Sequence, residues 1–447
     1  MSDLLAARSQ MAVSLYFHIL FAVAGIGMPL LMVVAEWRYR RTGDPVSLDL
    51  AKRWGKGTAI LFAVGAVSGT VLSFELGLLW PRFMELAGPV IGMPFSLEGF
   101  AFFLEGIFIG VYLYGWDRIS PRAHLLAGVM VAVSGAASGV FVVIANAWMN
   151  APTGFDFVHG RLTHVDPIAG MLNPMAFQQT LHMTIASYAA TGFAVAGIHA
   201  FLLLFDRTNA FHRRALAVAL LVGAPAAVLQ PLSGDLSARA VAVNQPAKLA
   251  AMESHFETGR RVPLVIGGIP DLDRRETRYA IRIPGGLSLL AFHDLNARVT
   301  GLEEFPRSDW PNVAIVHTAF QLMVGLGSLL ALLALWVGFL AIRRRDLSAN
   351  VWLLRALALA APVGFICIEA GWTVTEVGRQ PWVVYGILRT ADAVTPMPGL
   401  IVPFLGFSLL YCFLGIIVVW LLYRQIIRSP RPSEWTRTYA PPSVTRA

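Results

Sequence analysis

The stretch from Ile366 to Trp382 holds three ionisable side chains, Glu369, Glu376 and Arg379, at the end of an otherwise apolar run. Ionisable groups at membrane depth are costly unless they are paired, ligated or hydrated, so a carboxylate there indicates a functional site. The two glutamates are seven residues apart, which places them on one helix face, two turns from each other. Paired carboxylates on a buried face suit a proton relay.

Five more side chains of this chemical kind lie within other apolar runs. They are His18, Glu98, Glu105, His182 and Met323. At 1.5 Å of rise per residue, all five and Glu376 fall within roughly 16 Å of the same end of their predicted helices. Nitrogen and sulfur ligands beside carboxylates, without HExxH or CxxC, fit haem iron better than zinc.

Each of these side chains also has a structural explanation. A single histidine in an apolar helix is more often a hydrogen-bonded core residue than a ligand, and a methionine such as Met323 usually fills a gap in a core. His124 and His199 lie near the opposite helix ends, where surface roles explain them, and His317 could be interfacial. The chemical interpretation therefore depends on the group lying together.

Composition indicates a membrane protein. The 447 residues are 56% hydrophobic and only 14% charged, far more apolar than a soluble domain. Apolar runs long enough to cross a bilayer as a helix recur along the chain and predict an all-α polytopic protein. The nine expected spans are residues 11–35, 57–79, 93–115, 123–147, 177–204, 215–233, 312–342, 352–377 and 399–423.

Basic residues give the expected spans a direction. Arginine and lysine gather in every second connection, for example at Arg343 to Arg345, so the N-terminus is expected outside and the C-terminus inside. This sidedness explains the net charge of +8 without nucleic acid. Cys367 and Cys412 lie in separate apolar spans, which favours packing roles over a disulfide or a metal site.

One long outer loop is expected between the sixth and seventh spans. The chain then divides into spans one to six (1–233), the outer loop (234–311), spans seven to nine (312–423) and a cytoplasmic tail (424–447). Within the loop, alternation of Tyr279, Ile281 and Ile283 predicts a short hairpin. A loop this long in a compact protein is usually functional.

Eight motifs, in order and over nearly the whole chain, resemble those of subunit I of cytochrome bd type quinol oxidases. They are RSQMAVSLYFHILFA, EGFAFFLEGIFIGVYLYGW, ANAWMNAPTGF, QTLHMTIASY, KLAAMES, GIPDLDRRETRYAIRIPG, FQLMVGLG and GWTVTEVGRQPW.

The resemblance implies two b-type haems and a third haem, d or b. His182 and Met323 would be the axial pair of a low-spin b-type haem. His18 and Glu376 would ligate the two high-spin haems, in an order that the resemblance leaves open. Trp372 would lie between haems.

The resemblance also implies polar roles around these haems. Arg379 would pair with a haem propionate, and Glu98 and Glu105 would conduct protons or stabilise a haem. Lys248 and Glu253, in KLAAMES of the outer loop, would be the active pair for quinol. The residues alone favour a different explanation for KLAAMES, an amphipathic surface helix with both charges solvated.

The implied activity is that of a terminal respiratory oxidase in the bacterial cytoplasmic (inner) membrane. Quinol would be oxidised near the outer face and oxygen reduced to water with protons from inside, giving a proton gradient without pumping. Implied partners are a second oxidase subunit, a small single-span subunit, and membrane lipid, with no nucleic acid.

Two features depart from many members of the family. Gln321 stands where an arginine often precedes the methionine ligand, so a cation near the low-spin haem is expected to be missing. The outer loop is short, which resembles the cyanide-insensitive branch.

Two other function classes use similar residues. A secondary transporter or proton channel would use the same carboxylates, but neither an inverted repeat nor matching broken helices are evident in the sequence. A dihaem cytochrome b would typically use several His/His pairs, for which suitably placed histidines are too few.

Overall fold

The computed structural model describes residues 1–424, and within them nine helical spans are long and apolar enough to cross a membrane. The predicted all-α membrane architecture is thus confirmed, while the predicted sidedness stays a prediction. Nearly all of the expected tail lies outside the described residues. The spans are α1 (Asp3–Thr42), α2 (Pro45–Leu79), α3 (Pro81–Tyr114), α4 (Pro121–Asn150), α6 (Ala176–Leu203), α7 (Ala210–Asn244), α10 (Val313–Ile342), α11 with α12 (Val351–Ala360 and Val363–Val377) and α14 (Ile401–Leu422).

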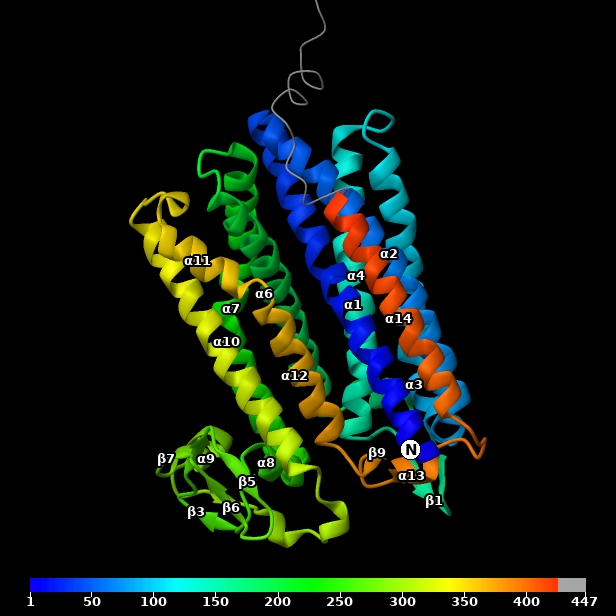
Figure 1. Cartoon of the computed structure of the whole chain (residues 1–447). Coiled ribbons are helices and arrows are strands. Elements are labelled where there is room, and N and C mark those ends of the chain that lie inside the picture. Colours follow the sequence, from blue (N-terminus) through cyan, green and yellow to red (C-terminus); the bar gives the residue numbers. More distant parts are fainter. Residues whose placement is uncertain (425–447) are drawn as a thin grey trace, which may run out of the picture.

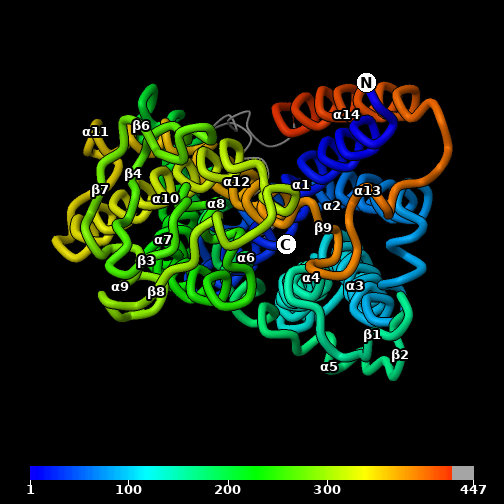
Figure 2. Tube along the Cα trace, turned by 90° about the horizontal axis from the view of Figure 1, so that it is seen from below, coloured from blue at the N-terminus to red at the C-terminus, as the bar shows by residue number. Residues whose placement is uncertain are grey.

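The spans form a bundle of two groups that meet at α1. Helices α2, α3, α4 and α14 lie on one side, and α6, α7, α10, α11 and α12 lie on the other (Figure 1, and from below in Figure 2). Helix α1 packs against α2, α4 and α14 and also against α6. Side chains of α1 can therefore face both groups.

Short polar caps set where several spans begin. Asp44 accepts a hydrogen bond from the Val46 backbone N–H at the start of α2, and Ser120 accepts one from Ala123 at the start of α4. A proline follows each cap directly, where its missing N–H costs no helical hydrogen bond. These caps keep the connections between the neighbouring helices short.

The eighth span is broken, although the sequence predicts one continuous helix over 352–377. Helix α11 ends at Ala360 and α12 begins at Val363, because Pro362 cannot donate the hydrogen bond of a helix interior. Gly364 lies against Ala190 of α6, so close that a Cβ at Gly364 would lie 2.5 Å from the Ala190 Cα. The break thus lets the span approach α6.

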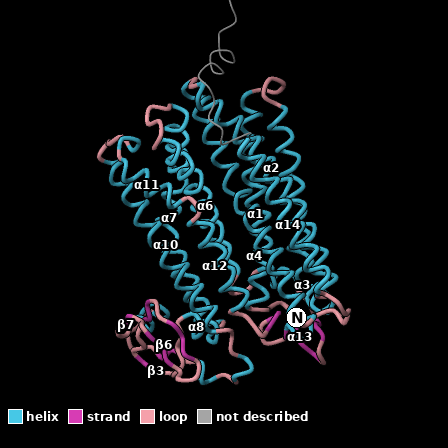
Figure 3. Tube along the Cα trace, in the orientation of Figure 1, coloured by secondary structure: helices cyan, strands magenta, loops and turns pink. Residues whose placement is uncertain are grey.

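The ten strands found in residues 1–424 lie at one end of the bundle, in five two-stranded sheets (Figure 3). We call this the lobe end, and residues 245–311 the lobe. The lobe contains α8 (Pro246–Met252), β3 (Gly259–Arg260), β4 (Leu264–Ile266), β5 (Ile269–Asp271), β6 (Glu276–Arg278), β7 (Ile281–Ile283), α9 (Gly286–Phe292), β8 (Arg298–Val299), η1 (Leu302–Glu304) and η2 (Arg307–Asp309).

The lobe differs in two ways from the expected loop. Helix α7 continues to Asn244, past the expected boundary at 233, and packs there against α8 and α9. The predicted hairpin is present as β5 paired with β6, enclosed by β4 paired with β7. Tyr279, however, has a positive φ and lies outside any strand, and both Ile281 and Ile283 are exposed.

The remaining short elements connect the spans. They are β1 (Asp156–Val158), β2 (Arg161–Thr163), α5 (Pro167–Met171), η3 (Leu347–Ala349), β9 (Trp382–Val384), β10 (Leu388–Arg389) and α13 (Thr390–Ala393).

Candidate functional site

His18 and His182 are held by the same local arrangement. The Nδ1 atom of His18 lies 3.0 Å from the Ser68 Oγ, which itself donates to the Val64 carbonyl of α2. The Nδ1 atom of His182 lies 2.9 Å from the Ser233 Oγ, which donates to a carbonyl of α7. Since each hydroxyl proton is used on a carbonyl, each serine accepts from Nδ1–H. This tautomer leaves the lone pair of each Nε2 available to a metal.

Glycines on neighbouring helices make room for three of the candidate ligands. A Cβ at Gly69 of α2 would lie 3.0 Å from the His18 ring, and one at Gly371 of α12 would lie 3.0 Å from the Met323 Sδ. A Cβ at Gly234 of α7 would lie 3.5 Å from the His182 ring, an ordinary contact distance. The Gln230 amide nitrogen also lies 3.1 Å from the His182 Nε2, so it would turn away on ligation.

Glu376 lies at the lobe end of α12, within a chain of polar side chains. Its Oε1 accepts from the Asn146 amide at 2.5 Å, and its Oε2 accepts from Arg379 Nη2 at 2.6 Å. Arg379 is buried, and its Nε and Nη1 have no hydrogen-bond partner within residues 1–424. The guanidinium therefore keeps two donors for an anionic group beside Glu376.

Lys248 belongs to this same chain rather than to a solvated surface helix. Its Nζ donates to Asn150 Oδ1 at 2.6 Å, and the Asn150 amide donates to Asn146 Oδ1 at 3.1 Å, which leads to Glu376. Burial and the nearby Arg379 hold the pKa of Lys248 well below its usual range, although Glu376 acts in the opposite direction. The solvated explanation for KLAAMES is wrong.

Glu253 turns away from Lys248, toward β4. The backbone N–H of Val265 donates to its carboxylate, and its Oε2 has no hydrogen-bond partner in the described part of the chain. Burial raises the pKa of Glu253 to about 8, and the Val265 hydrogen bond opposes this only in part. The two residues expected as a pair thus have separate partners, Asn150 for Lys248 and Val265 for Glu253.

Glu98 and Glu105 both face α4, as their seven-residue spacing predicts. Ser138 Oγ donates to Glu98 Oε1 at 3.3 Å, and a Cβ at Gly135 would lie 3.1 Å from Glu105 Oε1. Helix α4 also carries Asn146, so one helix faces both glutamates and Glu376. The structure places these three carboxylates along α4.

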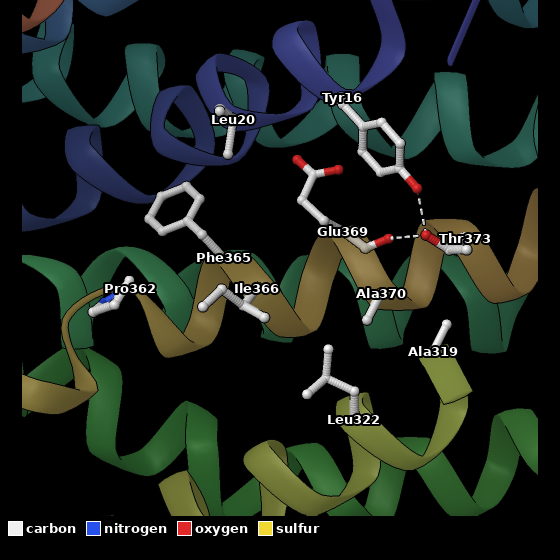
Figure 4. A pocket seen from close by; sticks show the side chains of 10 residues that line it. All are labelled: Tyr16, Leu20, Ala319, Leu322, Pro362, Phe365, Ile366, Glu369, Ala370 and Thr373. Carbon is white, nitrogen blue, oxygen red and sulfur yellow. Dashed lines mark hydrogen bonds between the residues drawn. The ribbon is translucent and has the colours of Figure 1, made fainter. Parts of the chain in front are cut away.

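Trp372 and Glu369 lie on α12 between the candidate ligands. Trp372 packs against a cluster that includes Ile19 of α1 and Ala190 of α6, the two helices that carry His18 and His182. Glu369 lines a cavity of about 410 Å³ between α1, α10 and α12, and its carboxylate points toward α1 (Figure 4). Both Glu369 oxygens are buried and have no hydrogen-bond partner within the described chain.

The other span histidines are structural, but not in the expected way. His124 is buried, with Nδ1 2.9 Å from Glu36 Oε1 and Nε2 2.9 Å from the Tyr112 carbonyl. His199 and His212 pair through their Nδ1 atoms at 3.0 Å. His317 is buried between two backbone carbonyls. The expected surface roles of His124 and His199 are wrong, because both side chains are buried, whereas the interfacial position of His317 stays a prediction.

Sequence reasoning missed the side chains that hold the candidate site together. Asn146 and Asn150 connect Glu376 with Lys248, and Ser68 and Ser233 orient the two histidines. The asparagines had a signal, because two amides four residues apart in an apolar helix share one face. The serines had none, since a hydroxyl in a membrane helix is usually satisfied by its own backbone.

Comparison with known proteins identifies the family. Residues 6–430 match the family model for cytochrome bd terminal oxidase subunit I. The chain belongs to this family. It is therefore a multi-pass protein of a bacterial inner membrane and a subunit of a respiratory terminal oxidase.

Relatives and a solved structure agree over nearly the full length. A Bacillus subtilis protein provisionally named cytochrome bd menaquinol oxidase subunit I is 39% identical, over 96% of this chain and 98% of its own. The cytochrome bd ubiquinol oxidase subunit 1 of the same organism is 32% identical, over 95% and 94%. The solved bd oxidase from Geobacillus thermodenitrificans is 39% identical with a TM-score of 0.90, covering 96% of this chain and 99% of that one.

The family implies haem, and the donors present fit haem. Among residues 1–424, no cluster of three His, Cys, Asp or Glu could hold a bare metal ion. Single donors from different helices are instead what axial ligation of haem iron requires. The buried free donors of Arg379 suit a haem propionate.

Proposed function

We propose that this chain is the haem-carrying subunit of a respiratory oxidase that oxidises quinol at the lobe end and reduces oxygen to water. Two relatives are named as menaquinol or ubiquinol oxidases, which supports quinol as the donor. The observation that carries the proposal is the pair of serine-anchored histidines, because anchoring through Nδ1 directs Nε2 to iron, in His182 once the Gln230 amide turns away.

In this proposal three haems lie between the helices. His182 and Met323 would together hold one b-type haem, and His18 and Glu376 would hold two further haems, one of type b and one of type d or b. Haem supplies electron transfer and oxygen reduction when bound. The chain's contribution is to fix each donor atom, through Ser233, Ser68 and, for Glu376, Asn146 with Arg379. Trp372 would fill the space between haems.

Glu253 is the proposed general base for quinol. A quinol gives up two protons on oxidation, and a carboxylate with an unused Oε2 in a buried position can accept one of them. Its raised pKa keeps the proton affinity of Glu253 close to physiological pH. Lys248, which is bonded to Asn150, is proposed to tune the Glu376 site instead of contacting quinol directly.

Glu98 and Glu105 are the proposed proton carriers for oxygen reduction. Both face α4, and Ser138 on that helix already donates to Glu98, so a proton route along α3 and α4 is supported. Protons taken from the side opposite the lobe and released at the lobe would create a gradient without a pump. Glu98 and Glu105 hold or pass protons at their carboxyl oxygens.

The proposed assembly includes subunit II and a small single-span subunit. Large apolar side chains are exposed along the faces of α2 and α3, including Phe74, Phe100 and Phe103. These faces can be buried against protein or lipid. The family is named for a first subunit, which supports a second one.

Quinol-dependent oxygen consumption by the purified complex, read together with its visible spectrum, tests the proposal. We expect haem bands in the reduced-minus-oxidised spectrum, and Glu253→Gln is expected to lose quinol turnover while keeping them. Glu257→Gln, an exposed carboxylate on the same segment, is the control and should keep both. Absence of haem bands from the purified complex would reject the proposed oxidase function. Normal quinol turnover by Glu253→Gln would reject only the proposed role of Glu253 as general base.

A further inference from the structure

The ribbon, residues 264–283, exposes an aliphatic face. In the β4–β7 pair, Ile266 is opposite Ile281 and Leu264 is opposite Ile283. Opposed residues in an antiparallel pair share a face, and every second residue returns to it. All four aliphatic side chains therefore lie on one face, and Ile281 is 67% exposed.

The rest of the ribbon adds apolar and basic side chains. Ile269 is 65% exposed and Tyr279 is 91% exposed, in a lobe that would otherwise face water. Contiguous exposed apolar surface of this kind usually marks an interaction site. Arg274, Arg275 and Arg282 are also exposed, while Arg278 forms ion pairs with Asp271 and Glu276 of the same ribbon. Isoleucine, tyrosine and arginine together are typical of a segment at a membrane surface.

Two side chains of α10 fix the depth of the ribbon. Gln321 accepts from the Gly267 N–H at 2.9 Å through Oε1 and donates to the Val265 carbonyl at 3.0 Å through Nε2. The His317 Nε2 lies 3.1 Å from the Gly267 carbonyl oxygen. The turn after β4 is therefore held beside α10 at the level of residues 317–321.

That level coincides with the expected membrane surface. Helix α10 ends at Ile342 and is followed by three arginines, which mark one surface of the bilayer. A hydrocarbon core of about 30 Å takes about 20 helical residues, so counting back from Ile342 reaches the other surface near Met323. Large exposed apolar side chains recur along α10 from Leu322 to Ile342, whereas only Ile315 is of this kind on the lobe side of Leu322 within α10.

The views of the chain show what surrounds the ribbon. In Figure 1 the lobe lies below the side of the bundle that holds α7 and α10, and in Figure 2 β7 lies farther out than β4 on that same side. The ribbon thus lies on the outer side of the bundle, at the level of the expected membrane surface.

We propose that the ribbon is a membrane-contact element that inserts its aliphatic face into the headgroup–acyl boundary of the leaflet on the lobe side. Arg274 and Arg275 then lie at headgroup level, where they attract anionic lipids. Lipid is the occupant because the ribbon is fixed at the height where lipid surrounds α10. This inference does not depend on the proposed quinol chemistry.

The same strand connects this surface to the interior. Ile266 of β4 carries the exposed face, and its neighbour Val265 donates its backbone N–H to Glu253. Lipid contact by the ribbon would therefore position a strand that holds the Glu253 carboxylate.

Spin labels in the whole complex test the proposal. Ile281→Cys, Ile266→Cys and the control Ser308→Cys are each made in a chain whose Cys367 and Cys412 are replaced by Ala. Ser308 is exposed on the 300–311 segment of the lobe, outside the ribbon. The parent without an added cysteine corrects for labels on other subunits.

Each labelled complex is placed in lipid nanodiscs, and relaxation by oxygen, which partitions into lipid, is compared with relaxation by a water-soluble nickel chelate. We expect an oxygen-to-nickel ratio severalfold higher at positions 281 and 266 than at 308. Equal ratios would place the ribbon in water and overturn the proposal. Shielding from both reagents would show a protein partner and would overturn it as well.

Lipid charge tests the role of the arginines. With Arg274→Gln and Arg275→Gln combined, the ratio at position 281 should fall in nanodiscs of anionic lipid and stay unchanged in zwitterionic lipid. If the double substitution leaves the oxygen-to-nickel ratio at position 281 unchanged in both lipids, the proposed contact of the arginines with headgroups is overturned.

Discussion

The two ends of the helix bundle satisfy their buried polar groups differently. At the end opposite the lobe, Glu36 accepts from Arg40 at 2.8 Å and bonds His124 at 2.9 Å. Both nitrogens of His124 are used, on Glu36 and on the Tyr112 carbonyl. Both nitrogens of the histidine and one carboxylate oxygen are thus satisfied by the chain, and the Glu36 Oε2 and the Tyr112 hydroxyl are the atoms of this network without a hydrogen-bond partner among the described residues.

At the lobe end, several polar side chains are held by a hydrogen bond to one of their atoms, while another atom of the same side chain stays unused. His18 and His182 are each anchored through Nδ1. Arg379 uses one nitrogen on Glu376 and keeps two buried donors without partners in the described residues. Burying a polar group without a partner is costly, so such groups persist where a ligand satisfies them. The difference separates a structural network from a site built for cofactors.

The largest expected effect is at Met323. Met323→Leu keeps the side-chain volume but removes the sulfur, so the low-spin haem should become high-spin or be lost, and electron transfer should fail with it. The reduced-minus-oxidised spectrum measures this. The control Met32→Leu, buried in α1, should cost less than about 1.5 kcal/mol of stability and keep the spectrum. An unchanged low-spin band in Met323→Leu would reject the ligand.

Replacing the two arginines compares the two ends directly. Arg379→Gln removes a buried guanidinium from its ion pair with the partly exposed Glu376, so it should cost at most about 3 kcal/mol of stability and should also lower the haem content. Arg40→Gln, at the opposite end, should lower the melting temperature and keep the haem-to-protein ratio. Thermal unfolding and pyridine extraction measure the two quantities. Equal haem loss in both variants would remove the distinction between the ends.

Much of the architecture followed from local sequence properties. Apolar runs of sufficient length predict the spans, and the seven-residue spacing of Glu98 and Glu105 predicts their shared face toward α4. The end of α7 at Asn244 did not follow, because packing against α8 and α9 extends the helix beyond its apolar part. The break at Pro362 had a clear local cause that hydropathy alone does not detect.

The candidate site was less predictable, because it depends on partners distant in sequence. Lys248 reaches Asn150, and His124 reaches Glu36, across 98 and 88 residues respectively. No spacing rule connects such positions. The family resemblance supplied the candidate ligands, and their roles stay predictions, whereas the structure alone supplied the serines and asparagines around them.

The pH dependence of quinol oxidation tests whether the Glu253 carboxylate accepts a proton from quinol. Its pKa is raised to about 8, and only the ionised carboxylate can accept a quinol proton, so the rate should rise about tenfold per pH unit below pH 8 and then level. Steady-state rates at saturating oxygen measure this. The rate of quinol oxidation by Glu253→Gln should be low and independent of pH, while Glu257→Gln should keep the pH profile of the wild type. A wild-type profile that levels two units lower would exclude Glu253 as the base.

The raised pKa of Glu253 affects the stability of the fold in the opposite direction to the rate as pH increases. A carboxyl that ionises near pH 8 when folded and near pH 4.5 when unfolded binds more protons in the folded state between these values. Stability should therefore fall as pH rises through this window and then remain constant. The free energy of unfolding of Glu253→Gln should lack this pH dependence, so the comparison of Glu253→Gln with the wild type measures it.

The smallest expected effect is at Glu369, the lobe-end group with the least evident role. Both of its oxygens face a cavity without hydrogen-bond partners in the described chain, so its replacement breaks no contact there. Glu369→Gln should keep the fold and haem spectrum, because the amide has nearly the same shape. If unused polar atoms at this end serve function, loss of an exchangeable carboxyl proton should slow oxygen reduction severalfold. Cys367→Ala, two residues away on α12, should keep the wild-type rate of oxygen reduction. Equal rates in the two variants would show that Glu369 has no part in oxygen reduction.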